Sequence, residues 1–289
     1  AIREKLKVAA QQAATFFSAR EEIAMNVVFI GDIVGRPGRE TVRRVMPWLR
    51  ETYRPHFVIA NGENAAGGRG ITAAIVQELF EAGVHGITMG NHTWDQREIF
   101  DFIDNEPRLV RPANLPPGTP GRGFSAIRAN GKELVIVNLI GRTFLPPAEC
   151  PFRTADAILE ELKDGHKCIL VDFHAEATSE KIAMGWHLDG RVSVVLGTHT
   201  HVQTVDGRIL PGGTAYVTDV GMTGPRDGIL GMKRDQVLRK FLTGLPSRFE
   251  VEEGGKWIFN GLFAEIDETT GAAAQIRMIR VSEDDWISS

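Results

Sequence analysis

The chain has 289 residues, of which 43% are hydrophobic and 24% are charged, a composition typical of a soluble globular protein. This length allows one large α/β domain or two small ones. A formal net charge of −4 excludes an overall basic field that would recruit nucleic acid or an anionic membrane. The sequence has no run of about 18 apolar residues, so no membrane span is predicted.

The first 24 residues differ from the rest of the chain. They are rich in Ala, Glu and Arg and contain no glycine or proline, so they predict a helix. They lack the long apolar core and the cleavage site of a signal peptide. We expect residues 1–24 to be an N-terminal extension, upstream of or added to a functional start at Met25. An appended interaction helix is the alternative. Residues 25–289 are expected to form a single domain.

The first part of that domain alternates strands with helices. Pro37 is well placed to open a helix that runs to about Tyr53, and Thr72 is suited to cap a helix that ends near Gly83. A glycine-rich turn over residues 65–70 precedes Thr72. Apolar runs predict strands over residues 26–31, 57–61 and 86–89, and a third helix is expected near residues 96–103.

The spacing of three polar residues indicates how these strands are connected. Asp32 and Glu63 are 31 residues apart, and Glu63 and Asn91 are 28 residues apart. Such distances are typical of βαβ units, so the three strands should be parallel.

The second part of the chain predicts a different arrangement. Pro and Gly cluster over residues 111–123, and Asn130-Gly131 predicts a hairpin between strands at 123–128 and 133–139. Helices are expected near 154–162, 179–188 and 234–241, and strands near 167–173, 192–196, 213–218, 256–266 and 273–281, with the last two antiparallel. The fold class predicted is α/β, a four-layer α/β/β/α sandwich of two mixed sheets.

Metal-ligand side chains follow five of the apolar runs. The segments are VVFIGD, VIANGEN, ITMGNH, ILVDFH and VVLGTHTH. Buried parallel strands read as continuous apolar runs, and ligands gather at the carboxyl ends of such strands. The sequence therefore predicts a metal site at one sheet edge, with these candidate ligands: Asp32, Glu63, Asn64, Asn91, His174, His199 and His201.

The ligand types and their number indicate the kind of site. A mixed nitrogen and oxygen set without thiolate suits Fe, Mn or Zn. Seven candidates exceed the four ligands of a single zinc site. They fit two ions that share a bridging carboxylate and lie about 3.5–4 Å apart, where a bridging hydroxide would be the nucleophile.

Two local patterns support shared ligation. In an extended backbone His199 and His201 would face the same way and could address neighbouring ions. Glu63 and Asn64 would diverge if extended, and we expect the glycine-rich turn after them to aim both inward.

His92 directly follows Asn91 and would lie just beyond the ions, where a scissile phosphate would rest. A histidine there can donate a proton to the leaving oxygen. Asp95, three residues later, is placed to orient the imidazole.

In combination, several segments of the chain resemble a known superfamily. They are GDIVGRPGR (31–39), NGENAAGGRGIT (61–72), GNHTWD (90–95), GTHTHVQT (197–204) and TDVGMTGP (218–225). Together with His174 they resemble the calcineurin-like metallophosphoesterase superfamily, and within it the bacterial YmdB-type group of 2′,3′-cyclic-nucleotide phosphodiesterases with a di-iron centre. The similarity runs from Met25 to about Ile287.

The resemblance implies a division of the ligands. One ion would be held by Asp32, Glu63, Asn64 and His201, the other by Glu63, Asn91, His174 and His199, with His92 as proton donor. Iron is the metal the resemblance implies, with Mn or Zn as alternatives. The chain departs from the wider superfamily at Val34, where many members have a histidine, and Asn64 stands in for that missing ligand.

Other polar residues have simpler interpretations. His56, His85, His166 and His187 lack ligand neighbours and are expected to be structural. Asp219 is interpreted equally well as a turn residue or as a pocket wall. The two cysteines, Cys150 and Cys168, are expected to be unpaired thiols in a reducing cytoplasm. No GxSxG nucleophile elbow is present, which argues against serine-hydrolase chemistry.

Three functional hypotheses follow. The first is a dinuclear metal-dependent phosphodiesterase acting on 2′,3′-cyclic nucleotides. The second is a regulatory interaction protein that binds RNA or a nucleotide, although the arginines form no tract. The third is a phosphomonoesterase or nuclease on the same fold. A homo-oligomer, dimer or tetramer, is expected.

Overall fold

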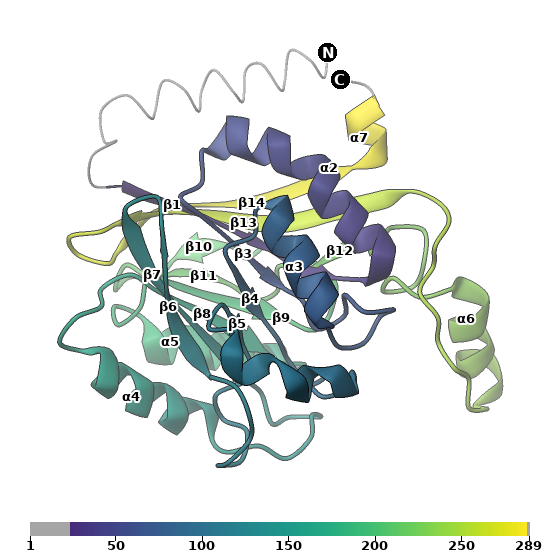
Figure 1. The fold of residues 1–289 in the computed structure, drawn as a ribbon, viewed down its shortest axis with the longest axis horizontal. Helices are drawn as coiled ribbons and strands as arrows, with labels where there is room; N and C mark the ends of the chain where they lie inside the picture. Colours follow the sequence, from purple (N-terminus) through teal and green to yellow (C-terminus); the bar gives the residue numbers. More distant parts are fainter. Residues whose placement is uncertain (1–23, 288–289) are drawn as a thin grey trace.

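Two mixed β-sheets pack face to face in the computed structural model, which describes residues 24–287 of the chain (Figure 1). In the first sheet, the neighbours β1, β3, β4 and β5 are parallel, while β13 is antiparallel to β1, β12 and β14. Its eight strands are β1 (Ala24–Ile30), β2 (Asp32–Ile33), β3 (Phe57–Asn61), β4 (Gly86–Thr88), β5 (Leu109–Val110), β12 (Met222–Pro225), β13 (Trp257–Asp267) and β14 (Ala273–Ser282).

The second sheet has a parallel centre with an antiparallel strand at each edge. Strands β7, β8, β9 and β11 run parallel, and β6 and β10 pair antiparallel at the two edges. Its strands are β6 (Phe124–Ala129), β7 (Lys132–Ile140), β8 (Ile169–His174), β9 (Val194–Thr198), β10 (Arg208–Ile209) and β11 (Ala215–Val217). The predicted parallel βαβ units and the antiparallel β13–β14 pair are confirmed.

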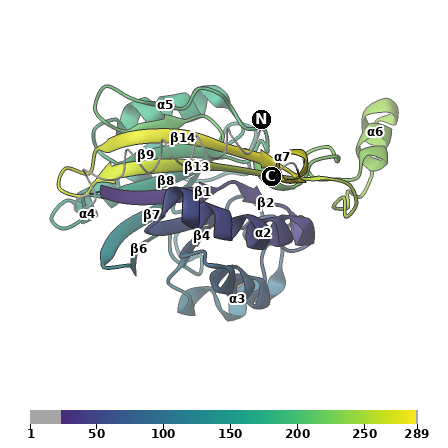
Figure 2. The same cartoon turned by 90° about the horizontal axis from the view of Figure 1, so that it is seen from above.

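Helices cover the outer face of each sheet. Helices α2 (Gly35–Tyr53) and α3 (Ala73–Ala82) pack on the first sheet, and α4 (Pro151–Leu162) and α5 (Thr178–Leu188) pack on the second. Figure 2 shows α2 with α3 and α5 on opposite sides of the two sheets. A third apolar cluster fills the space between the sheets. The predicted four-layer α/β/β/α sandwich is therefore confirmed.

The spacing of apolar residues explains how α2 is held. Val42, Val45, Met46 and Leu49 recur at helical spacing and are all buried. Such a stripe faces the core when a helix lies on a sheet. The predicted signals at the two ends of α3 are confirmed. The Thr72 hydroxyl accepts a hydrogen bond from the backbone N–H of Ile75, 3.4 Å away, and α3 ends at a glycine in the left-handed conformation.

The hairpin between β6 and β7 also forms at the predicted dipeptide. Asn130 and Gly131 both have positive φ, at 54° and 74°, and Ala129 pairs with Lys132 across the turn. Positive φ at both central residues matches the right-handed twist of the flanking strands, which is why Asn-Gly is favoured there.

One predicted helix is wrong. Residues 96–103 form two short 3-10 segments, η1 (Arg97–Asp101) and η2 (Ile103–Asn105), in place of an α-helix. The Gln96 side chain donates to the backbone carbonyls of Ala66 and Arg69 and does not cap the helix. The Gln96 side chain thus connects the start of this segment to the glycine-rich loop.

Other differences are small. Helix α4 begins three residues earlier than expected, because Pro151 occupies its first turn, where proline is tolerated. The two-residue strands β2, β5 and β10, the short β12 and helix α7 (Glu283–Ile287) were not predicted, since such short segments have no periodicity to detect. Ala24 belongs to β1, and the rest of the predicted N-terminal helix, residues 1–23, lies outside the described residues. We propose that residues 25–289 form one domain, because both sheets contribute to one apolar cluster.

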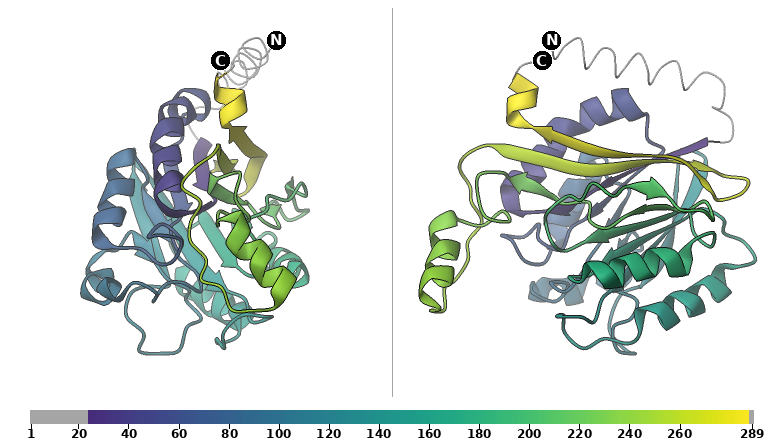
Figure 3. Two further views of the ribbon diagram at one scale, coloured as in Figure 1. Left: turned by 90° about the vertical axis from the view of Figure 1, so that its right-hand side faces the viewer. Right: turned by 180° about the vertical axis from the view of Figure 1, so that it is seen from behind.

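Helix α6 (Arg234–Thr243) stands apart from the four layers, as Figure 3 shows. Among residues 24–287, no helix combines the length and the apolarity needed to cross a bilayer.

A buried ion pair holds the segment that follows β9. Lys181 on α5 donates to the Asp219 carboxylate at 2.6 Å and to the backbone carbonyl of Thr198 at 2.7 Å, and both charged side chains are 1% exposed. Asp219 in turn accepts from the backbone N–H groups of Thr200 and Gly221. Asp219 therefore has a structural role, and its interpretation as a pocket wall stays a prediction.

Replacing Lys181 by Met should be strongly destabilising, because it leaves the Asp219 charge buried without its partner. We expect the free energy of unfolding, measured by urea denaturation, to fall by about 3–5 kcal/mol. Lys163→Met, which removes the exposed Lys163–Glu160 pair, is the control and should cost less than about 1 kcal/mol. Equal losses in the two variants would contradict this account.

Candidate metal centre

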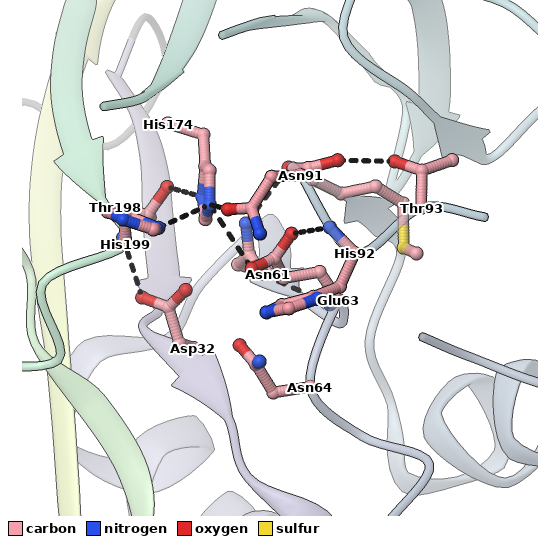
Figure 4. A network of polar contacts seen from close by, with 12 residues as sticks. Asp32, Asn61, Glu63, Asn64, Asn91, His92, Thr93, His174, Thr198 and His199 are labelled. Atoms are coloured by element: carbon pink, nitrogen blue, oxygen red, sulfur yellow. Dashed lines mark hydrogen bonds and ion pairs between the residues drawn. The ribbon is translucent and has the colours of Figure 1, made fainter. Parts of the chain in front are cut away.

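The carboxyl ends of strands from both sheets meet at one edge of the molecule. Strands β1, β3 and β4 lead into Asp32, Glu63 and Asn91, while β8 and β9 of the opposite sheet lead into His174 and His199. Figure 4 shows these side chains pointing toward one another across the junction between the sheets. Because parallel strands in each sheet end at the same edge, residues far apart in sequence become neighbours.

Four candidate ligands surround one point. The Nε2 atom of His174 lies 2.9 Å from Asn91 Oδ1, 3.0 Å from His199 Nδ1 and 3.1 Å from Glu63 Oε1. Ligand atoms of Glu63, His174 and His199 all lie within 4.8 Å of one another. Three of the four residues are buried or largely buried, so the group is shielded from bulk water.

The other three candidates form an adjacent group. His201 Nε2 lies 3.3 Å from Asn64 Oδ1 and 4.0 Å from Asp32 Oδ1. The second carboxylate oxygen of Asp32 accepts from the backbone N–H of His199 at 3.4 Å, which joins this group to the first. All seven predicted ligand residues therefore lie in two adjacent groups, and Glu63 contacts His174 in the group described first.

The arrangement of these atoms fits bound cations. A ring nitrogen carries at most one proton, so His174 Nε2 cannot donate to three facing atoms at once. A cation would satisfy them together, since metal–ligand distances of about 2.0–2.2 Å put neighbouring ligand atoms about 3 Å apart. Asp32 Oδ1 is fully buried and has no hydrogen-bond partner, a costly state that a cation would relieve.

The pKa shifts of the residues in this cluster also fit a site for cations. Burial raises the pKa of the Asp32 carboxyl to about 6. Burial also opposes charge on Glu63, but the positive charge of His174 lowers the Glu63 pKa to about 2, and Glu63 raises the pKa of His174 to about 9 against its burial. Burial, together with the charge on His174, lowers the pKa of His199 to about 3. A proton on His174 thus supplies positive charge that a bound cation would otherwise provide.

The backbone conformation at His199 and His201 differs from the predicted extended one. Strand β9 ends at Thr198, and His199 and His201 have φ values of 100° and 64°. The expectation of an extended His-Thr-His segment is therefore wrong. Two left-handed residues separated by Thr200 turn both rings toward the cluster, and such conformations in residues other than glycine are uncommon and concentrate at functional sites.

The expected bend after Glu63 is confirmed. Residues 63–68 form a turn in which the Asn64 carbonyl accepts from the Gly68 N–H and the Asn64 side chain donates to the Gly68 carbonyl. This turn aims Glu63 at the His174 group and Asn64 at His201.

His92 lies at the rim of the cluster. Its backbone N–H donates to Glu63 Oε2 at 2.9 Å, which ties its position to the ligand set. Its Nδ1 atom is 2.8 Å from the Asp95 carboxylate, and its side chain is 25% exposed. The predicted orienting contact from Asp95 is therefore present.

Sequence reasoning missed several polar residues behind the ligands. Asp172, Thr198, Asn61 and Thr88 form a buried hydrogen-bonded network next to His174. The available signal was an aspartate inside the apolar run ILVDFH, since a charge within a buried strand requires partners. Glu176 was also missed, and its carboxylate lies 3.1 Å from His199 Nε2.

The four histidines expected to be structural do have structural partners. His56 and His85 accept hydrogen bonds from the backbone N–H groups of Asn26 and Val58. His166 and His187 pair with the nearby carboxylates of Glu133 and Asp156.

Comparisons with known proteins agree on one family. The 2′,3′-cyclic-nucleotide 2′-phosphodiesterase of Bacillus subtilis (strain 168) is 57% identical over 260 residues, which cover 90% of this chain and 98% of that protein. A putative phosphatase/phosphodiesterase of Mycoplasma pneumoniae is 40% identical over 271 residues, covering 91% of this chain and 95% of that protein.

Solved structures and a family model complete the comparison. A hypothetical protein from Thermus thermophilus superposes with a TM-score of 0.84 at 44% identity, covering 90% of this chain and 100% of that one. A novel phosphatase from Mycoplasma pneumoniae gives 0.84 at 36% identity, covering 92% and 97%. The model of the YmdB-like protein family matches residues 28–279. The chain therefore belongs to the YmdB-like protein family.

Proposed function

We propose that this protein is a metal-dependent phosphodiesterase that hydrolyses 2′,3′-cyclic nucleotides. The observation that carries the proposal is the convergence of carboxylate, amide and imidazole ligand atoms around His174 Nε2 and Asp32 Oδ1. The name of the Bacillus subtilis relative supports the substrate class. A phosphodiesterase implies a small-molecule substrate, and the cluster fits divalent metal ions.

The residues divide between two metal ions in the proposed site. Asp32, Glu63, Asn64 and His201 would hold one, and Glu63, Asn91, His174 and His199 the other, with Glu63 shared. Iron is the proposed metal, with Mn or Zn as alternatives that the same nitrogen and oxygen ligands accept. When bound, two such ions act as Lewis acids and lower the pKa of water to near neutrality.

His92 is the proposed proton donor. Hydrolysis adds a water-derived oxygen to phosphorus and breaks one P–O ester bond, so the departing ribose oxygen needs a proton. The contact between His92 Nδ1 and the Asp95 carboxylate orients the ring, so that Nε2 is the nitrogen that would donate this proton. The relative is named a 2′-phosphodiesterase, so we propose that the 2′ ester bond breaks and a nucleoside 3′-monophosphate is left.

Two variants separate the proton donor from the metal ligands. His92→Ala should lower kcat on 2′,3′-cyclic AMP by about 10²–10⁴-fold while metal content stays unchanged. Asp32→Ala should lose both metal and turnover. The measurement is product formation with metal content assayed in the same sample. His187→Ala, remote from the cluster on α5, is the control and should match the wild type. Full turnover by metal-loaded His92→Ala would refute its role.

The same experiment distinguishes the alternative functions. Two bound ions with turnover of phosphomonoesters or nucleic acid, and none of cyclic nucleotides, would favour a monoesterase or nuclease. RNA affinity that survives Asp32→Ala, in a protein without hydrolytic activity, would favour a regulatory binding protein.

We also propose that the protein self-associates through α6. Leu238, Phe241 and Leu242 recur at the spacing of one face of α6, and Leu245 follows directly after the helix; these side chains are 48–82% exposed. An amphipathic helix normally buries such a stripe. Residues 234–249 hold four basic side chains and one acidic one, in a chain whose formal net charge is −4, so this arm is complementary in charge to the rest of a second copy.

Removing the stripe should shift the assembly. The double variant Phe241→Ser/Leu242→Ser should reduce the molar mass measured by light scattering after size exclusion from that of a dimer or tetramer to that of a monomer. Phe144→Ser, which replaces a phenylalanine that is 88% exposed elsewhere, should leave the mass unchanged. A monomeric wild type would contradict the proposal.

A cytoplasmic location is proposed from the cysteines. Both Cys150 and Cys168 are free thiols, and free thiols are typical of a reducing compartment.

A further inference from the structure

A buried carboxylate outside the ligand set lies directly behind His174. Asp172 is two residues before His174 on β8, so the two side chains share one face of the strand. It is fully buried and receives three hydrogen bonds. Thr198 donates to Oδ1 at 2.7 Å, and Thr88 and Asn61 donate to Oδ2 at 2.5 Å and 3.1 Å.

The orientation of each donor in this network can be worked out. Asn61 Oδ1 accepts from the backbone N–H of Glu63 at 3.1 Å, so the amide nitrogen of Asn61 is the group that faces Asp172. A threonine hydroxyl has one proton. Since Thr198 gives its proton to Asp172, its oxygen is left as an acceptor for its other neighbour, His174 Nδ1, 2.9 Å away.

This fixes which nitrogen of His174 keeps its proton when a metal ion replaces the proton on the other. Nδ1 must be protonated to donate to Thr198, so Nε2, which faces Glu63, Asn91 and His199, is the nitrogen whose lone pair a metal ion can take. A hydroxyl beside an imidazole could either donate or accept. The Asp172 carboxylate decides the direction, because it takes the only proton that Thr198 has.

The tautomers of His199 and His201 are set without a carboxylate behind the hydrogen-bond partner. His201 Nδ1 lies 3.0 Å from the backbone carbonyl of Leu230, and His199 Nε2 lies 3.1 Å from the Glu176 carboxylate. A carbonyl or a carboxylate can only accept, so each contact alone protonates the nitrogen that faces away from the cluster. The neighbour of His174 Nδ1 is the Thr198 hydroxyl, which could donate or accept. Asp172 is therefore required to make this hydroxyl an acceptor.

We propose that Asp172 and Thr198 form a relay that sets the tautomer of His174 and thereby presents Nε2 to a metal ion. Asp172 is a positioning residue, since it acts through Thr198 on His174 and through Asn61 on the backbone of Glu63. It thus orients ligands from both sheets. The inference rests on the proposed metal-binding function, and contacts of this kind typically change metal affinity 10–100-fold.

The test uses the full chain loaded with zinc, which gives no paramagnetic signal. Thr198→Val removes the hydroxyl while keeping the shape of the side chain. We expect zinc affinity, measured by competition with a chelator, to fall about 10–100-fold. Thr198→Ser restores the hydroxyl and should recover affinity. Thr223→Val is the control, since Thr223 is also fully buried and its hydroxyl donates to the Asn260 carbonyl, away from the relay.

A second readout reports the tautomer itself. In zinc-loaded protein with ¹⁵N-labelled histidine, the His174 resonances, assigned by comparison with His174→Gln, should show a protonated Nδ1 and a metal-bound Nε2. Zinc bound at Nδ1 would overturn the relay, and so would wild-type affinity in Thr198→Val or an equal loss in Thr223→Val. Neither readout needs substrate. A zinc-binding protein with this tautomer but no cyclic-nucleotide turnover would refute the proposed activity and leave the relay standing.

Discussion

The burial of two carboxylates at the junction of the sheets is the constraint on which the site depends. Asp32 and Glu63 are at most 1% exposed, and an ionised carboxylate without compensation is very costly in such surroundings. Glu63 is compensated by His174 and by the backbone N–H of His92, whereas Asp32 keeps one oxygen without a partner. The imidazoles and amides around them can be understood as the ligands that, with a cation, complete this compensation.

The scaffold keeps this arrangement rigid because each ligand follows the end of a buried strand. Strands β1 and β3 on one side and β8 and β9 on the other contribute to a shared apolar cluster, and β4 contributes Ile87 to the cluster beneath α2 and α3. The Lys181–Asp219 pair adds a polar clamp at the end of β9, where the backbone turns left-handed at His199 and His201. Precise placement of metal ligands requires such support, because their donor atoms must approach within about 3 Å without collapsing onto one another.

Polar contacts between the sheets give the site a second level of organisation. Asp172 from β8 accepts hydrogen bonds from Asn61 and Thr88 in the opposite sheet and from Thr198 in its own. Burial raises the pKa of Asp172, and the charge of His174 and these three donors oppose that shift. A fully satisfied buried network of this kind specifies one relative position of the two sheets, since sliding either sheet would break several hydrogen bonds at once.

By itself, the sequence determined the layered α/β fold, most elements to within a few residues, and the positions of all seven candidate ligands. These signals are local: apolar runs mark buried strands, and polar residues directly after them mark the strand ends. Local signals failed where long-range contacts decide the conformation. Residues 96–103 lie beside the glycine-rich loop, which Gln96 contacts, and form 3-10 segments, and His199 and His201 are not extended. Only the tertiary structure decided which nitrogen of each imidazole faces the cluster and that Asp172 supports His174, because donors and acceptors from opposite sheets must meet before their directions are set.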